Sequence, residues 1–162
     1  MVRARLGRYA WHVERQALRR GINATAVAPV AVDVGCGTVR STQAVQTAAA
    51  RVIGVDRSHA MLTVARHRHV TPLIAADAQA LPLRDGSVDL AIGVTVLEFV
   101  ADAEAVMTEL ARVVRPAGRI VIGARFAAGE LPVLRVLGAI CEFAGPAVPF
   151  VGAFQVLIVD RT

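Results

Sequence analysis

The sequence contains no lysine, so arginine supplies all 18 of its basic side chains. Aromatic residues make up only 4% of the chain, and Cys36 and Cys141 are the two cysteines. Two cysteines provide no disulfide framework. A core with so few aromatics must be built from aliphatic residues and alanine, which is typical of buried parallel strands covered by helices.

The sequence also lacks an uncharged run of about 20 apolar residues, the length that a membrane-spanning helix needs. The uncharged stretch from Phe143 to Val159 is shorter and holds two prolines and two glycines. We interpret it as a buried strand with a loop, and its apolar character leaves a peripheral membrane contact open. No apolar segment follows the basic N-terminus, as it would in a secretory signal, so we expect a cytoplasmic protein.

The net charge of +5 is concentrated at the N-terminal end. Residues 1–20 contain six arginines and one acid, whereas arginines and acids balance over the rest of the chain. This pattern is typical of a solvated helix face, or of an arm that meets an anionic substrate, a phosphate or a membrane surface. Aromatic interleaving and groove-reading motifs are lacking, so there is no clear nucleic-acid signal.

Apolar runs alternate with segments of helical periodicity, which predicts one domain with a doubly wound, mostly parallel sheet and helices on both faces. We expect strands at residues 30–34, 51–55, 72–75, 88–94, 119–123 and 154–159. We expect helices at residues 9–20, 41–50, 58–68, 102–114 and 131–143. Ser58 and Asp102 are expected N-caps, and residues 115–118 an expected turn.

An acid and two glycines follow the first expected strand, in the stretch Ala31-Val-Asp-Val-Gly-Cys-Gly-Thr-Val39. Such a turn lets backbone amides approach a ligand at the start of a helix. Asp56 and Asp77 follow the next two strands, and an acid after the second strand suits a ribose. These strand ends predict a site for an adenosine-containing cofactor. Arg40 stands where the dinucleotide fingerprint needs a small residue, which argues against a nicotinamide cofactor and a nucleotide-dependent oxidoreductase.

Four ordered blocks resemble the class I S-adenosylmethionine-dependent methyltransferases, and in particular the small-molecule branch that includes quinone-biosynthesis enzymes. The blocks are Val32-Asp-Val-Gly-Cys-Gly-Thr38, Val52-Ile-Gly-Val-Asp-Arg-Ser58, Ala76-Asp-Ala-Gln-Ala-Leu-Pro-Leu-Arg-Asp-Gly-Ser-Val-Asp89 and Leu110-Ala-Arg-Val-Val-Arg-Pro-Ala-Gly-Arg-Ile-Val-Ile122. The resemblance implies residues 30–125 as the cofactor-binding core and S-adenosyl-L-methionine as the cofactor. It implies a basic helix and lid in residues 1–29, and a shortened C-terminal helix and strand in residues 126–162.

The resemblance also implies a set of cofactor-binding residues: Asp33, Gly35, Cys36, Gly37, Asp56, Arg57, Asp77, Ala78, Val94 and Thr95. The loop after the first strand would hold the methionine part, with Asp33 orienting the loop and the ammonium group. Asp56 would bind the ribose, and Asp77 and Ala78 would meet the adenine edge. The guanidinium of Arg57 would stack where an apolar residue often covers the adenine. Val94 and Thr95 would form the floor beneath the methyl group.

Methyl transfer from a sulfonium is an in-line displacement that depends mainly on alignment and exclusion of water. A general base is needed only where the acceptor must lose a proton. Glu98, after the fourth strand, and His12, in the N-terminal helix, are the candidate bases, each with a purely structural alternative. We expect no metal. The acceptor is expected to be a small hydrophobic or anionic molecule, with a homodimer or partner subunit completing the pocket.

Val39 departs from the family pattern, because a third glycine usually stands at this position. A β-branched side chain here would be strained if the backbone needs a positive φ, and it could crowd the methionine part of the cofactor. Val39 and the missing terminal elements together leave an alternative function, a non-catalytic methyltransferase-like module that binds a partner.

Overall fold

The computed structural model describes residues 16, 18, 19, 22, 28–46, 48–68, 72–125, 141–143 and 154–161. The strands are β1 (Ala28–Val34), β2 (Ala49–Asp56), β3 (Leu73–Ala75), β4 (Val88–Val94), β5 (Val114–Arg125), β6 (Cys141–Phe143) and β7 (Phe154–Arg161). The helices are α2 (Arg40–Val45), α3 (His59–Arg66) and α4 (Ala103–Val113), with a short 3₁₀ helix at Leu97–Phe99. His12, and with it nearly all of the expected lid, lies outside the described residues.

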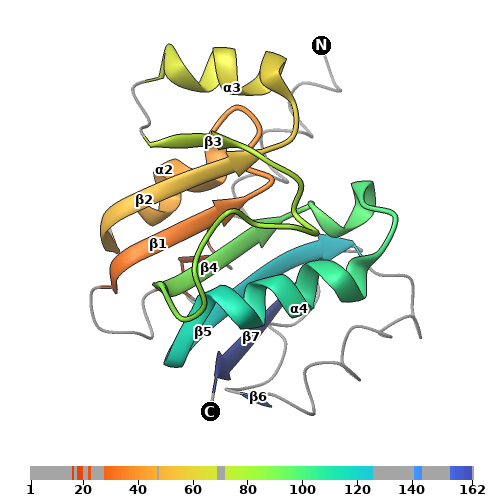
Figure 1. Ribbon diagram of the computed structural model, residues 1–162. Coiled ribbons are helices and arrows are strands. Elements are labelled where there is room, and N and C mark those ends of the chain that lie inside the picture. The colour runs from red at the N-terminus through yellow and green to blue at the C-terminus, as the bar shows by residue number, and fades with distance from the viewer. Residues whose placement is uncertain are drawn as a thin grey trace.

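The strands form one seven-stranded sheet in the order β3-β2-β1-β4-β5-β7-β6 (Figure 1). The first five strands of the chain are parallel, and β7 is antiparallel to both of its neighbours, β5 and β6. From β1 the chain builds the sheet first toward β2 and β3, and then on the other side toward β4 and β5. The order therefore reverses between β1 and β4, and ligands of doubly wound sheets bind at such a switch point. This confirms the predicted fold class.

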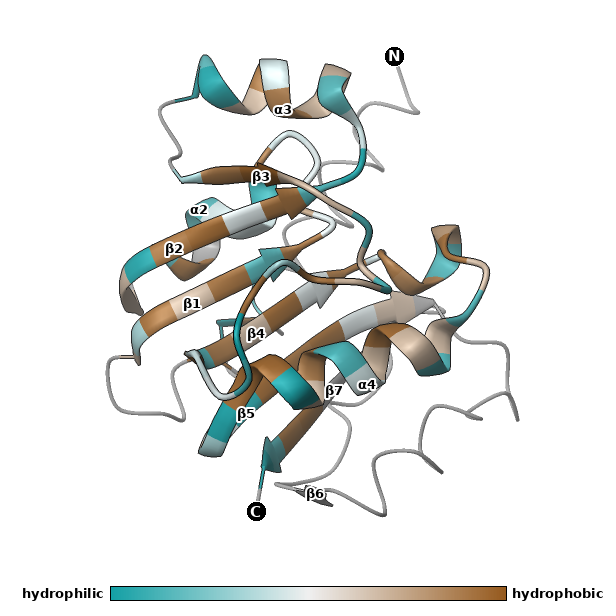
Figure 2. Cartoon of the chain, in the orientation of Figure 1, coloured by the Kyte–Doolittle hydropathy of each residue, from teal (hydrophilic) through white to brown (hydrophobic). Residues whose placement is uncertain are grey.

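The central strands are apolar because helices cover the sheet on both faces. In a half-exposed strand, buried and exposed residues alternate. In β4, six of the seven residues are buried, and Asp89 is the exception. Figure 2 shows this concentration of hydrophobic residues along β1, β4 and β5. The unbroken apolar run is thus the mark of a fully enclosed strand.

Helix α4 covers one face of the sheet with an apolar stripe (Figure 1). Its buried residues recur at helical spacing: Val106, Met107, Leu110, Ala111 and Val113. The Asp102 carboxylate caps the helix by accepting the backbone N–H of Ala105 at 3.0 Å, and Ser58 caps α3 through the N–H of Met61 at 3.3 Å. Both predicted N-caps are confirmed, since a side-chain oxygen satisfies a backbone donor that the helix leaves free.

The opposite face packs against residues near the N-terminus. Leu18 and Ile22 are helical and almost fully buried, and they belong to a cluster with Ala31, Leu90 and Ile92 of the sheet. Their spacing of four residues places both on one helix face. No helix in the described part of the chain is long and apolar enough to span a membrane.

Two expected boundaries are wrong in the central part of the chain. Helix α2 ends at Val45, and Ala49 and Ala50 belong to β2, because pairing with β1 extends that strand toward its start. The expected turn at residues 115–118 lies within β5. Four residues lie between Val114 and Arg119 on β5, whereas only Asp89 lies between their partners Val88 and Leu90 on β4, so residues 115–118 form an irregularity in the β4–β5 ladder.

The end of the expected helix at residues 131–143 is also wrong. Its last three residues form β6, which pairs antiparallel with β7, while residues 131–140 lie outside the described part. Within the described residues, two antiparallel strands therefore follow β5, where the sequence predicts one. A strand of three residues is too short to show a periodicity of its own, and its assignment depends on pairing with β7.

Candidate functional site

A pocket of about 530 Å³ lies at the carboxyl ends of the parallel strands, beside the switch point. Such a volume suits a ligand of cofactor or drug size. The lining residues come from the ends of β1 to β4 and the segments that follow them: Val34, Gly35, Gly37, Thr38, Val55, Asp56, Arg57, Ser58, Met61, Ala76, Asp77, Ala78, Val94, Thr95, Val96, Phe99 and Val100. Segments far apart in the sequence thus meet at one place.

The loop after β1 brings backbone to the pocket. Gly35 and Gly37 have φ values of 71° and 50°, a region that side chains rarely adopt. A Cβ on Gly35 would lie 2.8 Å from Cγ2 of Val96, whereas a Cβ on Gly37 would meet nothing within 4 Å. Gly35 therefore packs against the opposite wall, and Gly37 borders open space in the pocket.

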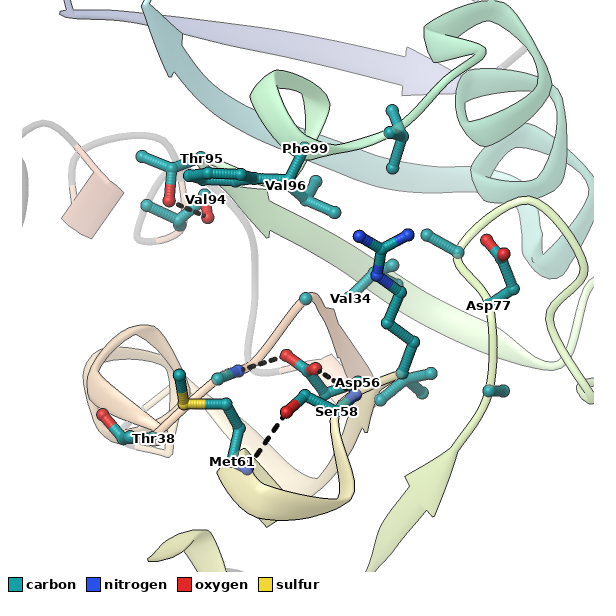
Figure 3. Close-up of a pocket in the computed structure, with 17 residues that line it drawn as sticks. Val34, Thr38, Asp56, Ser58, Met61, Asp77, Val94, Thr95, Val96 and Phe99 are labelled. Atoms are coloured by element: carbon teal, nitrogen blue, oxygen red, sulfur yellow. Dashed lines mark hydrogen bonds between the residues drawn. The ribbon is translucent and has the colours of Figure 1, made fainter.

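Asp56 joins this loop to helix α3. Its Oδ2 accepts the backbone N–H of Gly37 at 2.8 Å, and its Oδ1 accepts the N–H of Ser58 at 2.8 Å, as the dashed lines in Figure 3 mark. Each carboxylate oxygen has two lone pairs, so both can accept a further hydrogen bond from a ligand hydroxyl.

Asp77 lies at another side of the pocket in Figure 3. Its Oδ1 accepts the backbone N–H of Gln79 at 2.9 Å, and this hydrogen bond is the main cause that lowers the pKa of the carboxyl. No described residue donates to Oδ2, which leaves that oxygen available as an acceptor. Arg57 lines the same pocket, and its charge contributes to the lower pKa of Asp77.

The wall after β4 is apolar. In Figure 3, Val94, Thr95 and Phe99 lie across the pocket from Thr38 and Met61. Thr95 has a φ of 57°, and its hydroxyl donates to the carbonyl of Val94 at 2.7 Å. Phe99 is 69% exposed and Met61 is 45% exposed, so two large apolar side chains border the pocket and also face solvent.

Asp33 is fully buried and does not line the pocket. Its Oδ2 accepts the hydroxyls of Ser41 at 2.7 Å and Thr42 at 2.6 Å, which tie β1 to the start of α2. Its Oδ1 is buried without a partner in the described part of the chain. Burial raises the pKa of this carboxyl to about 6, because the charged form loses its hydration.

Cys36 is likewise buried and outside the lining. Burial, with the nearby carboxylates of Asp33 and Asp56, raises the pKa of its thiol to about 12. The side chain is therefore a neutral thiol at physiological pH and packs as a small apolar group. Asp33 and Cys36 thus support the loop from behind, while the eight other cofactor residues implied by the resemblance line the pocket.

Val39 has the positive φ at which we expect a β-branched side chain to be strained, with φ 64° and ψ 31°. Its side chain is fully buried in a cluster with Cys36, Leu62 and Ala65, and it does not line the pocket. The side chain therefore stabilises the contact between the loop and α3. Val39 therefore does not narrow the pocket.

We predict that Val39→Gly leaves the affinity for S-adenosylhomocysteine within about threefold of the wild type, because no pocket contact is lost. Glycine removes about 1–2 kcal/mol of left-handed strain, but it also removes a buried side chain worth about 1.5–3 kcal/mol. The variant should be slightly less stable to urea. Calorimetry and urea unfolding measure the two quantities, and a tenfold gain in affinity would show that Val39 does obstruct the site.

Glu98, a candidate base, is exposed in the 3₁₀ helix and does not line the pocket, although Phe99 beside it does. Among the described residues, the titratable side chains that do line it are those of Asp56, Arg57 and Asp77. No described cluster of His, Cys, Asp and Glu could hold a metal ion. The cofactor-binding set implied by the resemblance does not include nine of the lining residues: Val34, Thr38, Val55, Ser58, Met61, Ala76, Val96, Phe99 and Val100. Nearness to a strand end is the signal that would have found them.

A mostly parallel sheet with a glycine loop and two carboxylates at its switch point defines the class of S-adenosylmethionine-dependent methyltransferases with a class I fold. Comparison with known proteins agrees, because residues 32–122 match the model of the family described as the methyltransferase domain. The chain belongs to this family, and the predicted resemblance is confirmed.

Curated relatives include a demethylmenaquinone methyltransferase of Corynebacterium kroppenstedtii, 36% identical over 73% of this chain and 43% of the relative. A malonyl-[acyl-carrier protein] O-methyltransferase of Serratia marcescens is 33% identical over 62% of this chain and 38% of the relative. The chain therefore spans less than half the length of these two relatives.

Solved structures show the same fold. The N-methyltransferase NodS of Bradyrhizobium japonicum, in complex with S-adenosyl-L-homocysteine, superposes with a TM-score of 0.76 at 16% identity, over 93% of this chain and 86% of NodS. A possible histamine N-methyltransferase of Thermotoga maritima has a TM-score of 0.73 at 23% identity, over 96% of this chain and 90% of that protein.

The residues present fit the cofactor of this family. Asp56 offers acceptors for sugar hydroxyls, and Asp77 offers a carboxylate oxygen with no described donor. The glycine loop leaves open space at Gly37 for an amino-acid moiety, and the remaining walls are mainly apolar. This donor set, in a cavity of about 530 Å³, suits a nucleoside joined to an amino acid.

Proposed function

We propose that this protein transfers a methyl group from S-adenosyl-L-methionine to a small, mainly apolar acceptor. One observation carries the proposal: the ends of four strands gather a glycine loop, two carboxylates and an apolar wall around a single pocket. A site with only one of these features would suit many ligands. Their combination matches the three parts of the cofactor, namely an amino acid, a ribose and a base.

The roles follow from the available hydrogen-bonding groups. Asp56 holds the ribose hydroxyls while keeping its bonds to the loop and to α3. Asp77 accepts the exocyclic amino group of the adenine through Oδ2, and Ala78 lies against the ring edge. The guanidinium plane of Arg57 covers the base by stacking. Gly35 and Gly37 allow the methionine part to lie against the backbone.

When bound, the cofactor supplies a methyl group that its positively charged sulfur activates for displacement. The protein then has to align the acceptor and exclude water. Val94, which ends the central strand β4, and Thr95 and Val96, which follow it, form a mainly apolar wall for this purpose. Acceptors that react without losing a proton need no general base. Glu98 is our candidate for acceptors that must lose a proton.

The apolar character of the acceptor is proposed from the pocket border. Phe99 and Met61 expose apolar surface there that an apolar acceptor would cover. Demethylmenaquinone methyltransferases among the relatives support an aromatic ring with an apolar tail. Arg57 is the one basic residue among the described residues that line the pocket, so an anionic group is a secondary feature of the acceptor.

The test is isothermal calorimetry of the wild-type chain with S-adenosylhomocysteine, followed by assays with methyl-labelled cofactor. We expect saturable binding, and methyl incorporation into members of a quinone and phenol panel. The absence of binding by folded protein at millimolar ligand would overturn the proposed function. Binding with incorporation only into polar acceptors would overturn the proposed acceptor class alone.

A further inference from the structure

Helix α4 holds the segment that follows Asp77 through one arginine. Arg112 Nη2 donates to the carbonyl of Leu81 at 3.0 Å. Its Nη1 donates to the carbonyl of Leu83 at 2.8 Å and to the carboxylate of Asp85 at 2.6 Å. The planar guanidinium can reach three groups of the loop at once because its donors form a fixed fork.

Glu109, one turn earlier on α4, completes this contact. Its Oε2 accepts the backbone N–H of Leu81 at 2.7 Å. The same carboxylate accepts Nε and Nη2 of Arg112, both at 2.7 Å, in a bidentate pair. The pair lowers the pKa of Glu109 and raises that of Arg112, so both groups stay charged at physiological pH. Leu81 is therefore held through its N–H and its carbonyl.

The loop is tied to α4 at its other end as well. The side chain of Gln79 accepts the backbone N–H of Asp102, the N-cap of α4, at 3.1 Å and donates to Asp77 Oδ1 at 3.3 Å. The carbonyl of Asp77 accepts the N–H of Ala80 at 3.1 Å. The path from Asp77 to Asp85 thus follows α4 along its length and has little freedom to shift.

We propose that Glu109 and Arg112 are positioning residues that hold Asp77 and Ala78 at the place from which they discriminate the base of the bound cofactor. Neither residue lines the pocket, so neither touches the ligand directly. Their effect passes through Leu81, which is buried in the main core four residues after Asp77. This inference rests on the proposed function, because it concerns the same cofactor site.

The experiment compares two ligands in calorimetry: S-adenosylhomocysteine, and its inosine analogue with oxygen in place of the exocyclic amino group. In the wild type, Asp77 accepts the amino group and repels the oxygen, so we expect a preference of at least roughly tenfold for the adenine ligand. In Arg112→Met we expect this preference to fall to about twofold or less. General destabilisation would weaken both ligands alike and leave the ratio unchanged.

The matched control is Arg115→Met, which removes another ion pair of the same sequence block. Arg115 Nε donates to Asp89 Oδ1 at 2.5 Å, and neither residue lines the pocket. This variant should keep the wild-type ratio of affinities. Arg112→Lys retains a cation beside Glu109 but lacks the planar fork. It provides a milder variant with an intermediate ratio if Arg112→Met fails to fold.

Amide hydrogen exchange gives a readout that needs no ligand. The amides of Leu81 and of Gly86, which donates to the carbonyl of Arg112 at 2.9 Å, should exchange faster in the Arg112 variants than in the control. A wild type that binds neither ligand would overturn the proposed function and this inference with it. If the wild type prefers the adenine ligand and both Arg112 variants keep the same ratio of affinities, the positioning role alone would be overturned.

Discussion

Replacing Asp56 by alanine should weaken the binding of S-adenosylhomocysteine by roughly a hundredfold, or about 3 kcal/mol. The carboxylate accepts backbone N–H groups from both the glycine loop and the start of α3, at 2.8 Å each. Alanine therefore removes the acceptors proposed for the ribose and also releases two segments that line the pocket. The effect should exceed that of losing one ligand hydrogen bond.

Two further variants sharpen this experiment. Asp56→Asn keeps an oxygen acceptor but loses the charge and one acceptor, so it should show an intermediate loss. Glu104→Ala removes an exposed acid from the first turn of α4, away from the pocket, and should bind like the wild type. Urea unfolding checks that each variant is folded. An affinity of Asp56→Ala within about threefold of the wild type would refute the proposed ribose contact.

Asp33→Asn should gain stability over the wild type as the pH rises from about 4 to 7, by about 3 kcal/mol in total. The folded state raises the pKa of Asp33 from 3.8 to about 6. Below both values the carboxyl is protonated in the folded and unfolded states. Between them the unfolded chain releases its proton more readily, so the wild type loses stability as the pH rises. Above about 6 the loss is complete.

Asparagine is neutral throughout this range, so the variant does not lose folding stability in this way. The folded state lowers the pKa of other acids, such as Asp89 and Glu109. These acids therefore stabilise the folded state, and their contribution is lost as the pH falls. They are common to both proteins and cancel in the difference of their unfolding free energies. Urea unfolding at a series of pH values measures that difference. A difference independent of pH would show that Asp33 keeps an ordinary pKa in the folded protein.

Local chemistry accounts for the elements that sequence reasoning located well. The strand at residues 88–94 was predicted with the bounds that the structure shows, because a long aliphatic run follows the Asp85-Gly86 turn. The caps at Ser58 and Asp102 depend only on a side-chain oxygen just before a helix. β6 escaped prediction because its three residues become a strand only by pairing with residues 159–161.

The sequence by itself determined the class of fold, the family resemblance and the meeting of Asp56 and Asp77 at one edge of the sheet. It could do so because parallel strands bring their carboxyl ends together whatever the details of packing. Only the tertiary structure decided which side chains of the first loop face the pocket. Asp33, Cys36 and Val39 lie beside residues that line it, yet all three are buried behind it. The positive φ values at Gly35, Gly37 and Val39 set those directions, and the packing of α3 against the loop holds them in place.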